Sequence, residues 1–173
     1  MFTIQLLTNA PSAAIHNGLI DLLCDSVEGG ASVGFLAPLR RETAAAYWQA
    51  VLAELSSALR VILVATTEDQ EVAGSVQLSI SPKENGRHRA EVQKLLVHRR
   101  YRRRGLARRL MDTLEIEAQQ RGVSLLVLDT VEGETAEQVY LKLGYTRAGE
   151  IPNYARLPAG RFCSTVIFYK ELR

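Results

Sequence analysis

The 173-residue sequence predicts a mixed α/β (α+β) fold, in which helices flank a central and mostly antiparallel sheet. Two runs rich in Val and Ile, at 61–66 and 71–80, are joined by a four-residue turn, which is typical of an antiparallel hairpin. Farther along, strand Arg89–Val97, the long helix that begins at Leu106 and the apolar strand Ser124–Thr130 form a β-α-β unit. Such a unit implies one parallel pair within the sheet.

Before the hairpin, the sequence predicts one strand and two helices. The strand covers Phe2–Leu7, and apolar residues recur on one face of a helix over Ile15–Asp25. A glycine-rich loop, Gly29–Phe35, separates that helix from a second one, Glu42–Leu59, which is rich in Ala and Leu. The helical faces should pack on the sheet that follows.

The second half is expected to continue the sheet beyond the hairpin. The pair Asn85-Gly86 favours a tight turn with left-handed backbone conformations before the strand at 89–97. The long helix should end at Arg121-Gly122, because glycine suits a left-handed position after a helix. A helix over Thr135–Leu143 and strands over Tyr145–Ile151 and Thr165–Lys170 complete the prediction.

Composition places the chain among ordinary globular proteins, with 47% apolar and 23% charged residues. We expect a single domain over residues 1–173, since no linker or repeat divides the chain. No apolar run is long enough to cross a membrane and no signal peptide is evident, so we expect a cytoplasmic protein without a membrane partner. Cys24 and Cys163 lie far apart, which gives no support to a disulfide motif or a metal site.

Charge is concentrated in one window of the chain. Seven of the 21 basic residues fall within residues 99–109, which contain no acid, whereas 14 basic and 19 acidic residues make up the rest. A local positive field on an otherwise acidic protein favours a compact anionic ligand. A nucleic-acid reader would normally carry a second basic surface, so we expect no nucleic-acid partner.

The strand-to-helix junction within this window has the features of an anion site. Gly105 and Ala107 are small, and the first amides of a helix lack internal acceptors, so an anion such as pyrophosphate can approach the backbone. Arginine side chains can add bidentate contacts. Neither a P-loop nor a dinucleotide-binding pattern is present. The alternative interpretation is a solvated basic helix start, or a nucleic-acid or localisation patch.

The string from Val92 to Ala107 resembles the acyl-CoA-binding motif of the GNAT superfamily of N-acetyltransferases, with matches at Arg102, Gly105 and Ala107. A second motif of that superfamily is matched by Ala136, Tyr140, Gly144 and Tyr145. Many members have proline at the position of Arg99 and asparagine at that of Gly133. The resemblance implies acetyl-CoA (coenzyme A) as cofactor and a sheet that splays where it binds. The implied cofactor-binding residues are Leu95, Leu96, Val97, Arg102, Arg103, Arg104, Gly105, Leu106, Ala107, Thr135 and Ala136.

The same resemblance suggests residues for direct acetyl transfer to an amine. Tyr140 stands where the family places a general acid beside the CoA sulfur, and a packed aromatic residue is the alternative. Glu91 and Asp129 lie on the strands that would flank the splay, and either carboxylate could accept the amine proton. Weaker candidates for acceptor binding are Ser32, Phe35, Asn153 and Tyr154.

Much of the chain is most similar to the tabtoxin-resistance acetyltransferases within this superfamily, which implies a small-molecule amine as substrate, such as an amino-acid-like toxin or antibiotic. Protein or peptide N-acetylation and a non-catalytic acyl-CoA-binding module are the alternatives. Homodimers are common in the family and are compatible with this sequence.

Overall fold

The computed structural model describes residues 1–173 and contains one seven-stranded sheet flanked by four α-helices. The strands lie in the order β1-β2-β3-β4-β5-β7-β6, and only β4 and β5 pair in parallel. The predicted mixed and mostly antiparallel sheet is therefore confirmed. The elements are β1 (Thr3–Leu6), α1 (Ala13–Glu28), α2 (Arg41–Ala53), β2 (Arg60–Thr66), β3 (Val72–Ile80), β4 (Arg89–Val97), α3 (Leu106–Gln120), β5 (Leu125–Val131), α4 (Thr135–Lys142), β6 (Thr146–Arg156) and β7 (Phe162–Glu171).

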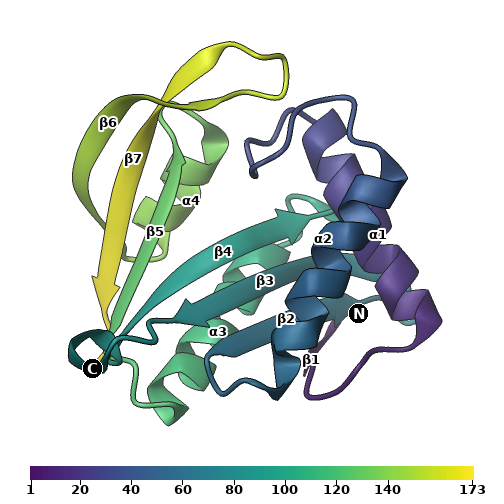
Figure 1. Cartoon of the computed structure of the whole chain (residues 1–173), viewed down its shortest axis with the longest axis horizontal. Coiled ribbons are helices and arrows are strands. Elements are labelled where there is room, and N and C mark those ends of the chain that lie inside the picture. Colours follow the sequence, from purple (N-terminus) through teal and green to yellow (C-terminus); the bar gives the residue numbers. More distant parts are fainter.

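Helices cover both faces of the sheet (Figure 1). Strand β2 shows why this is required, because its side chains are apolar on both sides. Val61 and Leu63 belong to the core beneath α3 and α4, whereas Ile62 and Val64 belong to the core beneath α1 and α2. The sheet is thus the middle of three layers, and burial of both faces stabilises it.

Local signals define the ends of the two longest helices. The Ser12 hydroxyl accepts a hydrogen bond from the Ile15 N–H, so α1 begins two residues before the predicted Ile15. Helix α3 begins after Gly105 and is followed by Gly122, and both glycines have left-handed backbones, with φ of 74° and 75°. The predicted end of this helix at Arg121-Gly122 is confirmed.

Two local predictions were wrong. Helix α2 ends at Ala53 instead of Leu59, and the Ser57 hydroxyl, which accepts from the Leu59 N–H, holds the following turn outside the helix. The Asn85-Gly86 turn is a 3₁₀ turn, and neither residue has a positive φ. An added Cβ at Gly86 would lie 2.7 Å from Ser81 Oγ, so a larger residue there would displace that hydroxyl.

The last two strands are longer than predicted. Strand β6 continues to Arg156 through a shift in its pairing with β7, next to Asn153, whose φ is 53°. Strand β7 begins at Phe162, three residues before the predicted start. An irregular ladder of this kind interrupts the two-residue alternation by which a strand is recognised in sequence.

None of the helices is both long and apolar enough to serve as a membrane span.

Candidate active site

Strands β4 and β5 separate soon after they meet. They pair only from Arg89 opposite Leu125 to Glu91 opposite Val127. Beyond that point β4 contains a bulge, because Lys94 and Leu95 together face one residue of β3, and Lys94 has a φ of 51°. The bulge bends β4, and its remaining main chain has no strand partner on the β5 side. Figure 1 shows the resulting splay in the middle of the sheet.

The three residues proposed to bind the cofactor through their main chain occupy this open edge. The side chains of Leu95 and Val97 pack against the core beneath α3, whereas Leu96 is buried beneath α1 and α2. Gly74 on β3 lies so close to this segment that an added Cβ would be 2.8 Å from the Leu96 carbonyl oxygen. The side chains thus anchor the strand, and its edge on the β5 side has no strand partner here.

The turn between β4 and α3 presents a row of free amides. None of the main-chain N–H groups from Arg102 to Arg108 donates a hydrogen bond to a protein acceptor, and the first helical bond runs from Arg109 N–H to the Gly105 carbonyl. Arg103 and Gly105 have positive φ, at 61° and 74°. Successive amides in such a turn, at the positive end of a helix dipole, suit an oxyanion. Leu106 is buried and anchors the helix start.

The seven arginines of the basic window do not act as one patch. Five of them use a guanidinium N–H within the protein: Arg99 to Asp25, Arg100 to Glu71, Arg102 to the Val97 carbonyl, Arg108 to the Lys142 carbonyl and Arg109 to the Phe2 carbonyl. Arg103 and Arg104 make no such bond, and Arg104 lies 5.7 Å from the ring of Tyr101. Only Arg99 and Arg100 are paired with carboxylates, whereas Arg102, Arg108 and Arg109 bond to neutral carbonyls and keep their charge, as do Arg103 and Arg104 next to the free amides.

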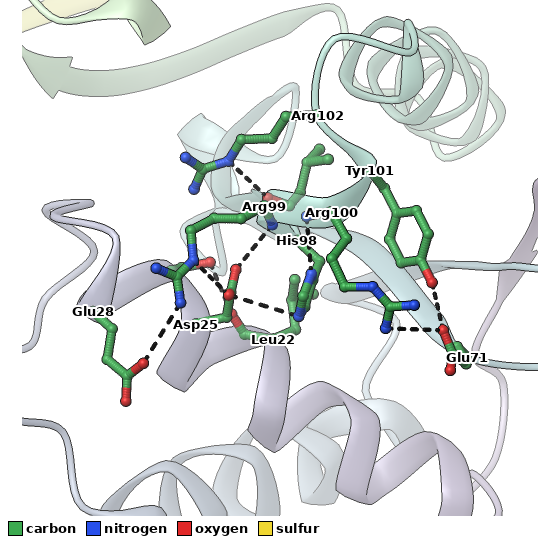
Figure 2. Close-up of polar contacts among 11 residues, drawn as sticks. Leu22, Asp25, Glu28, Glu71, His98, Arg99, Arg100, Tyr101 and Arg102 are labelled. Atoms are coloured by element: carbon green, nitrogen blue, oxygen red, sulfur yellow. Dashed lines mark hydrogen bonds and ion pairs between the residues drawn. The ribbon is translucent and has the colours of Figure 1, made fainter.

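Asp25 clamps the turn to α1, as Figure 2 shows. Its carboxylate accepts from the Arg99 main-chain N–H at 3.0 Å and from Arg99 Nε at 2.7 Å, while His98 Nε2 lies 3.6 Å away. Asp25 is only 9% exposed. Burial alone opposes its ionisation, but the hydrogen bonds from Arg99 and the charges of His98 and Arg99 outweigh it, and the pKa of Asp25 is lowered. A proline at position 99 could not donate the main-chain bond.

This clamp predicts a pH-dependent loss of stability in Asp25→Asn. Because the folded-state pKa lies below the ordinary value of 3.8, the contribution of Asp25 is complete above that value and disappears as the pH falls through the folded pKa. We expect the variant to lose about 1–2 kcal/mol of unfolding free energy at pH 7 and less at pH 3, in urea titrations. Glu28→Gln is the control, because the Glu28 carboxylate is exposed and lies 3.6 Å from Arg99 Nη2. Equal losses in both variants would contradict the clamp.

A cavity of about 460 Å³ lies where β4 and β5 begin to diverge. Glu91, Asp129 and Tyr154 line it, together with Arg89 and Ile167. Glu91 makes no hydrogen bond or ion pair with the protein. Thr165 Oγ1 lies 2.8 Å from Asp129 Oδ2 and 2.9 Å from the Thr130 carbonyl, either of which can accept its proton. The structure thus brings the two candidate bases and one candidate acceptor residue around a single opening.

Tyr140 lies on α4, behind β5. It is 8% exposed, and its ring centroid is 5.8 Å from that of Tyr145 and 6.1 Å from that of Phe168. Its hydroxyl has no hydrogen-bond partner in the protein. Burial, with a smaller contribution from the charge of Asp129, raises the pKa of Tyr140 far above its ordinary value. The phenol therefore keeps its proton at neutral pH and can act as a hydrogen-bond donor.

The other predicted residues are more dispersed. Phe35 packs edge-on against Tyr47, with ring centroids 5.5 Å apart, and Ser32 is half-buried in the same loop. Asn153 is exposed at the irregularity of β6 and does not line the cavity. Thr135 and Ala136 form the first turn of α4, and Ala136 packs against the main core.

Two residues near the site were not anticipated from the sequence. Asp25 is 74 positions from its partner Arg99, so no local pattern could join them. Lys94 did leave a signal, because Gln93-Lys94 places two polar residues in succession within an apolar strand. Such a break in alternation is the mark of a bulge.

Comparison with known proteins agrees with this geometry. The acetyltransferase (GNAT) family matches residues 31–145. An uncharacterized N-acetyltransferase from the hisH-hisA intergenic region of Azospirillum brasilense is 33% identical over 133 residues, which cover 75% of this chain and 76% of that protein.

Two solved structures share the fold over almost all of both chains. A candidate phosphinothricin N-acetyltransferase superposes with a TM-score of 0.80 at 16% identity, covering 100% of this chain and 99% of its own. The candidate acetyltransferase yncA from Salmonella typhimurium was solved with its cofactor acetyl-CoA. It superposes with a TM-score of 0.77 at 20% identity, covering 99% of this chain and 94% of its own. The family match, the relative and the fold agree: this chain belongs to the GNAT family of acetyltransferases and is an acetyl-CoA-dependent N-acetyltransferase.

Proposed function

We propose that the protein acetylates the primary amine of a small molecule by direct transfer from acetyl-CoA. The observation that carries this proposal is the cavity of about 460 Å³ at the splay, with Glu91 and Asp129 on its wall. A cavity of this size fits a compact acceptor. The solved structures are less than 25% identical to this chain and show the fold alone, so the acceptor is argued from the cavity.

The residues proposed to hold acetyl-CoA come from the end of β4, the turn that follows it and the start of α4. Leu95, Leu96 and Val97 lie on the part of β4 that has no strand partner on the β5 side, and the free amides from Arg102 to Ala107 follow at the helix start. Arg103 and Arg104 supply cations beside those amides, and Thr135 and Ala136 belong to the first turn of α4. Bound acetyl-CoA supplies the thioester whose acetyl group is transferred.

We assign the base to Glu91 and a supporting role to Asp129. Glu91 has no competing donor, so its carboxylate is free to accept a proton from the amine. Asp129 shares its carboxylate with Thr165 and is close enough to Tyr140 to raise the pKa of that phenol. Asp129 thus suits an ammonium group or the fixing of local geometry. Tyr140 keeps the proton that the departing sulfur requires.

This division of roles predicts unequal effects of two isosteric substitutions. Glu91→Gln should lower kcat by about 100-fold, the usual contribution of a general base. Its Kd for acetyl-CoA should stay unchanged in calorimetry. Asp129→Asn should affect mainly the KM of the amine. A larger kcat loss in Asp129→Asn than in Glu91→Gln would reverse the assignment.

A panel of amines tests the proposed function itself. Purified protein with acetyl-CoA should release free thiol in the presence of at least one small amine, and mass spectrometry should find the N-acetylated product. Peptides with free N-termini form a parallel arm of the panel. Acetylation of peptides alone would favour the protein-acetylating alternative, and acetyl-CoA binding without any acetylation would favour the non-catalytic module.

A further inference from the structure

The residue at the bulge of β4 is a lysine whose charge has no partner. Lys94 Nζ makes no hydrogen bond, and no carboxylate oxygen lies within ion-pair distance of it. The side chain is half-buried. Burial lowers the pKa of Lys94, while the charges of Glu91 and Asp129 act in the opposite direction from a greater distance. A desolvated ammonium group with unused donors is costly unless a ligand satisfies it.

Lys94 extends toward Tyr47 of α2 and Gly34 of the loop between α1 and α2. Its ammonium lies 5.4 Å from the ring centroid of Tyr47, and an added Cβ at Gly34 would lie 3.9 Å from Nζ. Tyr47 is fixed in turn, because Gln77 Nε2 donates to its hydroxyl at 3.0 Å. Lys94, Gly34 and Tyr47 are called the Lys94 subsite below.

The loop above this subsite is tied to the other side of the splay. Gly34 belongs to the connection between α1 and α2, which Figure 1 shows reaching toward the β6–β7 turn. The Ala37 N–H donates to the Pro158 carbonyl at 3.0 Å, so the two loops are joined. The Lys94 subsite therefore lies under a loop that bridges the two halves of the sheet.

Lys94 differs from Arg60, on the same face of the sheet, in the contacts that its charged group makes. Arg60 also points from the sheet toward α2, but its guanidinium is bonded to Glu54 at 2.7 Å and to Gln93 Oε1 at 3.0 Å. Arg60 therefore serves the fold. Arg89 of the cavity wall is also unpaired but is exposed to solvent, so Lys94 is the half-buried cation without a carboxylate partner, three residues from Glu91 on the same strand.

We propose that Lys94 binds an anionic group of the acceptor, so that the preferred substrates are amines that also carry a carboxylate, as amino acids do. This inference rests on the proposed function. The acceptor side would then match a zwitterion: Glu91 and Asp129 face its amine, and Lys94 faces its carboxylate. An amine without an anionic group would leave Lys94 desolvated and unpaired, so such an amine should bind more weakly.

The test compares matched acceptors in matched variants. L-Methionine and L-leucine are each paired with the corresponding α-carboxamide, which keeps the amine and removes the negative charge. Wild type should prefer the free acids in kcat/KM by about 10- to 100-fold, the usual range for a hydrogen bond to a charged group. Lys94→Met should lose this preference, Lys94→Arg should keep part of it, and the exposed Lys142→Met should leave it unchanged.

A binding readout separates this inference from the proposed function. Thermal shifts of the CoA-loaded protein are measured with the same four compounds. Stabilisation by the free acids that is absent in Lys94→Met supports the subsite even if no amine is acetylated. If wild type acetylates amines without preferring the acids, or if Lys94→Met keeps the preference, the subsite is refuted and the proposed function stands. If the free acids neither stabilise the protein nor are acetylated, both the Lys94 subsite and the proposed function are overturned.

Discussion

Replacing Gly105 by glutamate is expected to abolish measurable acetyl-CoA binding. Gly105 has a φ of 74°, and a non-glycine residue there costs about 1–2 kcal/mol of backbone strain. No protein atom lies within 4 Å of the position of an added Cβ, so the new side chain would extend into the space beside the free amides. Its carboxylate would place a negative charge where the anion is proposed to bind.

Gly122→Glu is the matched control for that experiment. Gly122 lies at the opposite end of the same helix, has a φ of 75°, and is equally free of neighbours. Both variants should therefore lose similar thermal stability without ligand. Calorimetry should then show acetyl-CoA binding in Gly122→Glu and none in Gly105→Glu. Undiminished binding by Gly105→Glu would remove the turn from the cofactor site.

Tyr140→Phe is expected to lower kcat by about 10- to 100-fold while the Kd for acetyl-CoA changes little. The variant removes only the hydroxyl, which has no protein partner, so the packing of the ring is preserved. The effect should lie at or below the lower end of general-acid contributions, because a thiol with a pKa of about 8.5 is a good leaving group. Pre-steady-state measurements at saturating substrates would separate the transfer step from product release.

Tyr145→Phe provides the comparison for Tyr140. The two rings are in edge contact at 5.8 Å, and both belong to the core beneath α3 and α4. A general disturbance of this aromatic cluster would slow both variants. Loss of turnover in Tyr140→Phe alone is the result expected of a proton donor, whereas unchanged kcat in that variant would eliminate the role.

Local features made much of the fold predictable. Gly105 and the apolar spacing of α3 identified the turn and the helix, and the apolar run at Ser124–Thr130 identified β5. The end of α2 was missed because Ser57 competes for the backbone through its hydroxyl, a contact that propensity does not describe. Local chemistry therefore predicted which elements form more reliably than where they end.

The candidate site was predictable only where its residues are close in sequence. The turn from Arg102 to Ala107 is one continuous segment, and its amides follow from its backbone. The cavity joins Glu91, Asp129 and Tyr154 from three strands, and the bulge at Lys94 depends on the register against β3. The clamp between Asp25 and Arg99 likewise depends on how α1 packs. Long-range pairing of this kind arises only in the folded chain.

The contacts of the arginines affect which anions can bind at the turn between β4 and α3. A loose cluster of cations attracts any polyanion with little regard to shape, and salt screens it readily. Here five guanidinium groups are already engaged within the protein, and neutral peptide dipoles with fixed directions occupy the turn itself. Fixed peptide dipoles stabilise an anion only when its oxygens lie in line with the N–H groups. The turn can therefore discriminate among anions by geometry as well as attract them by charge.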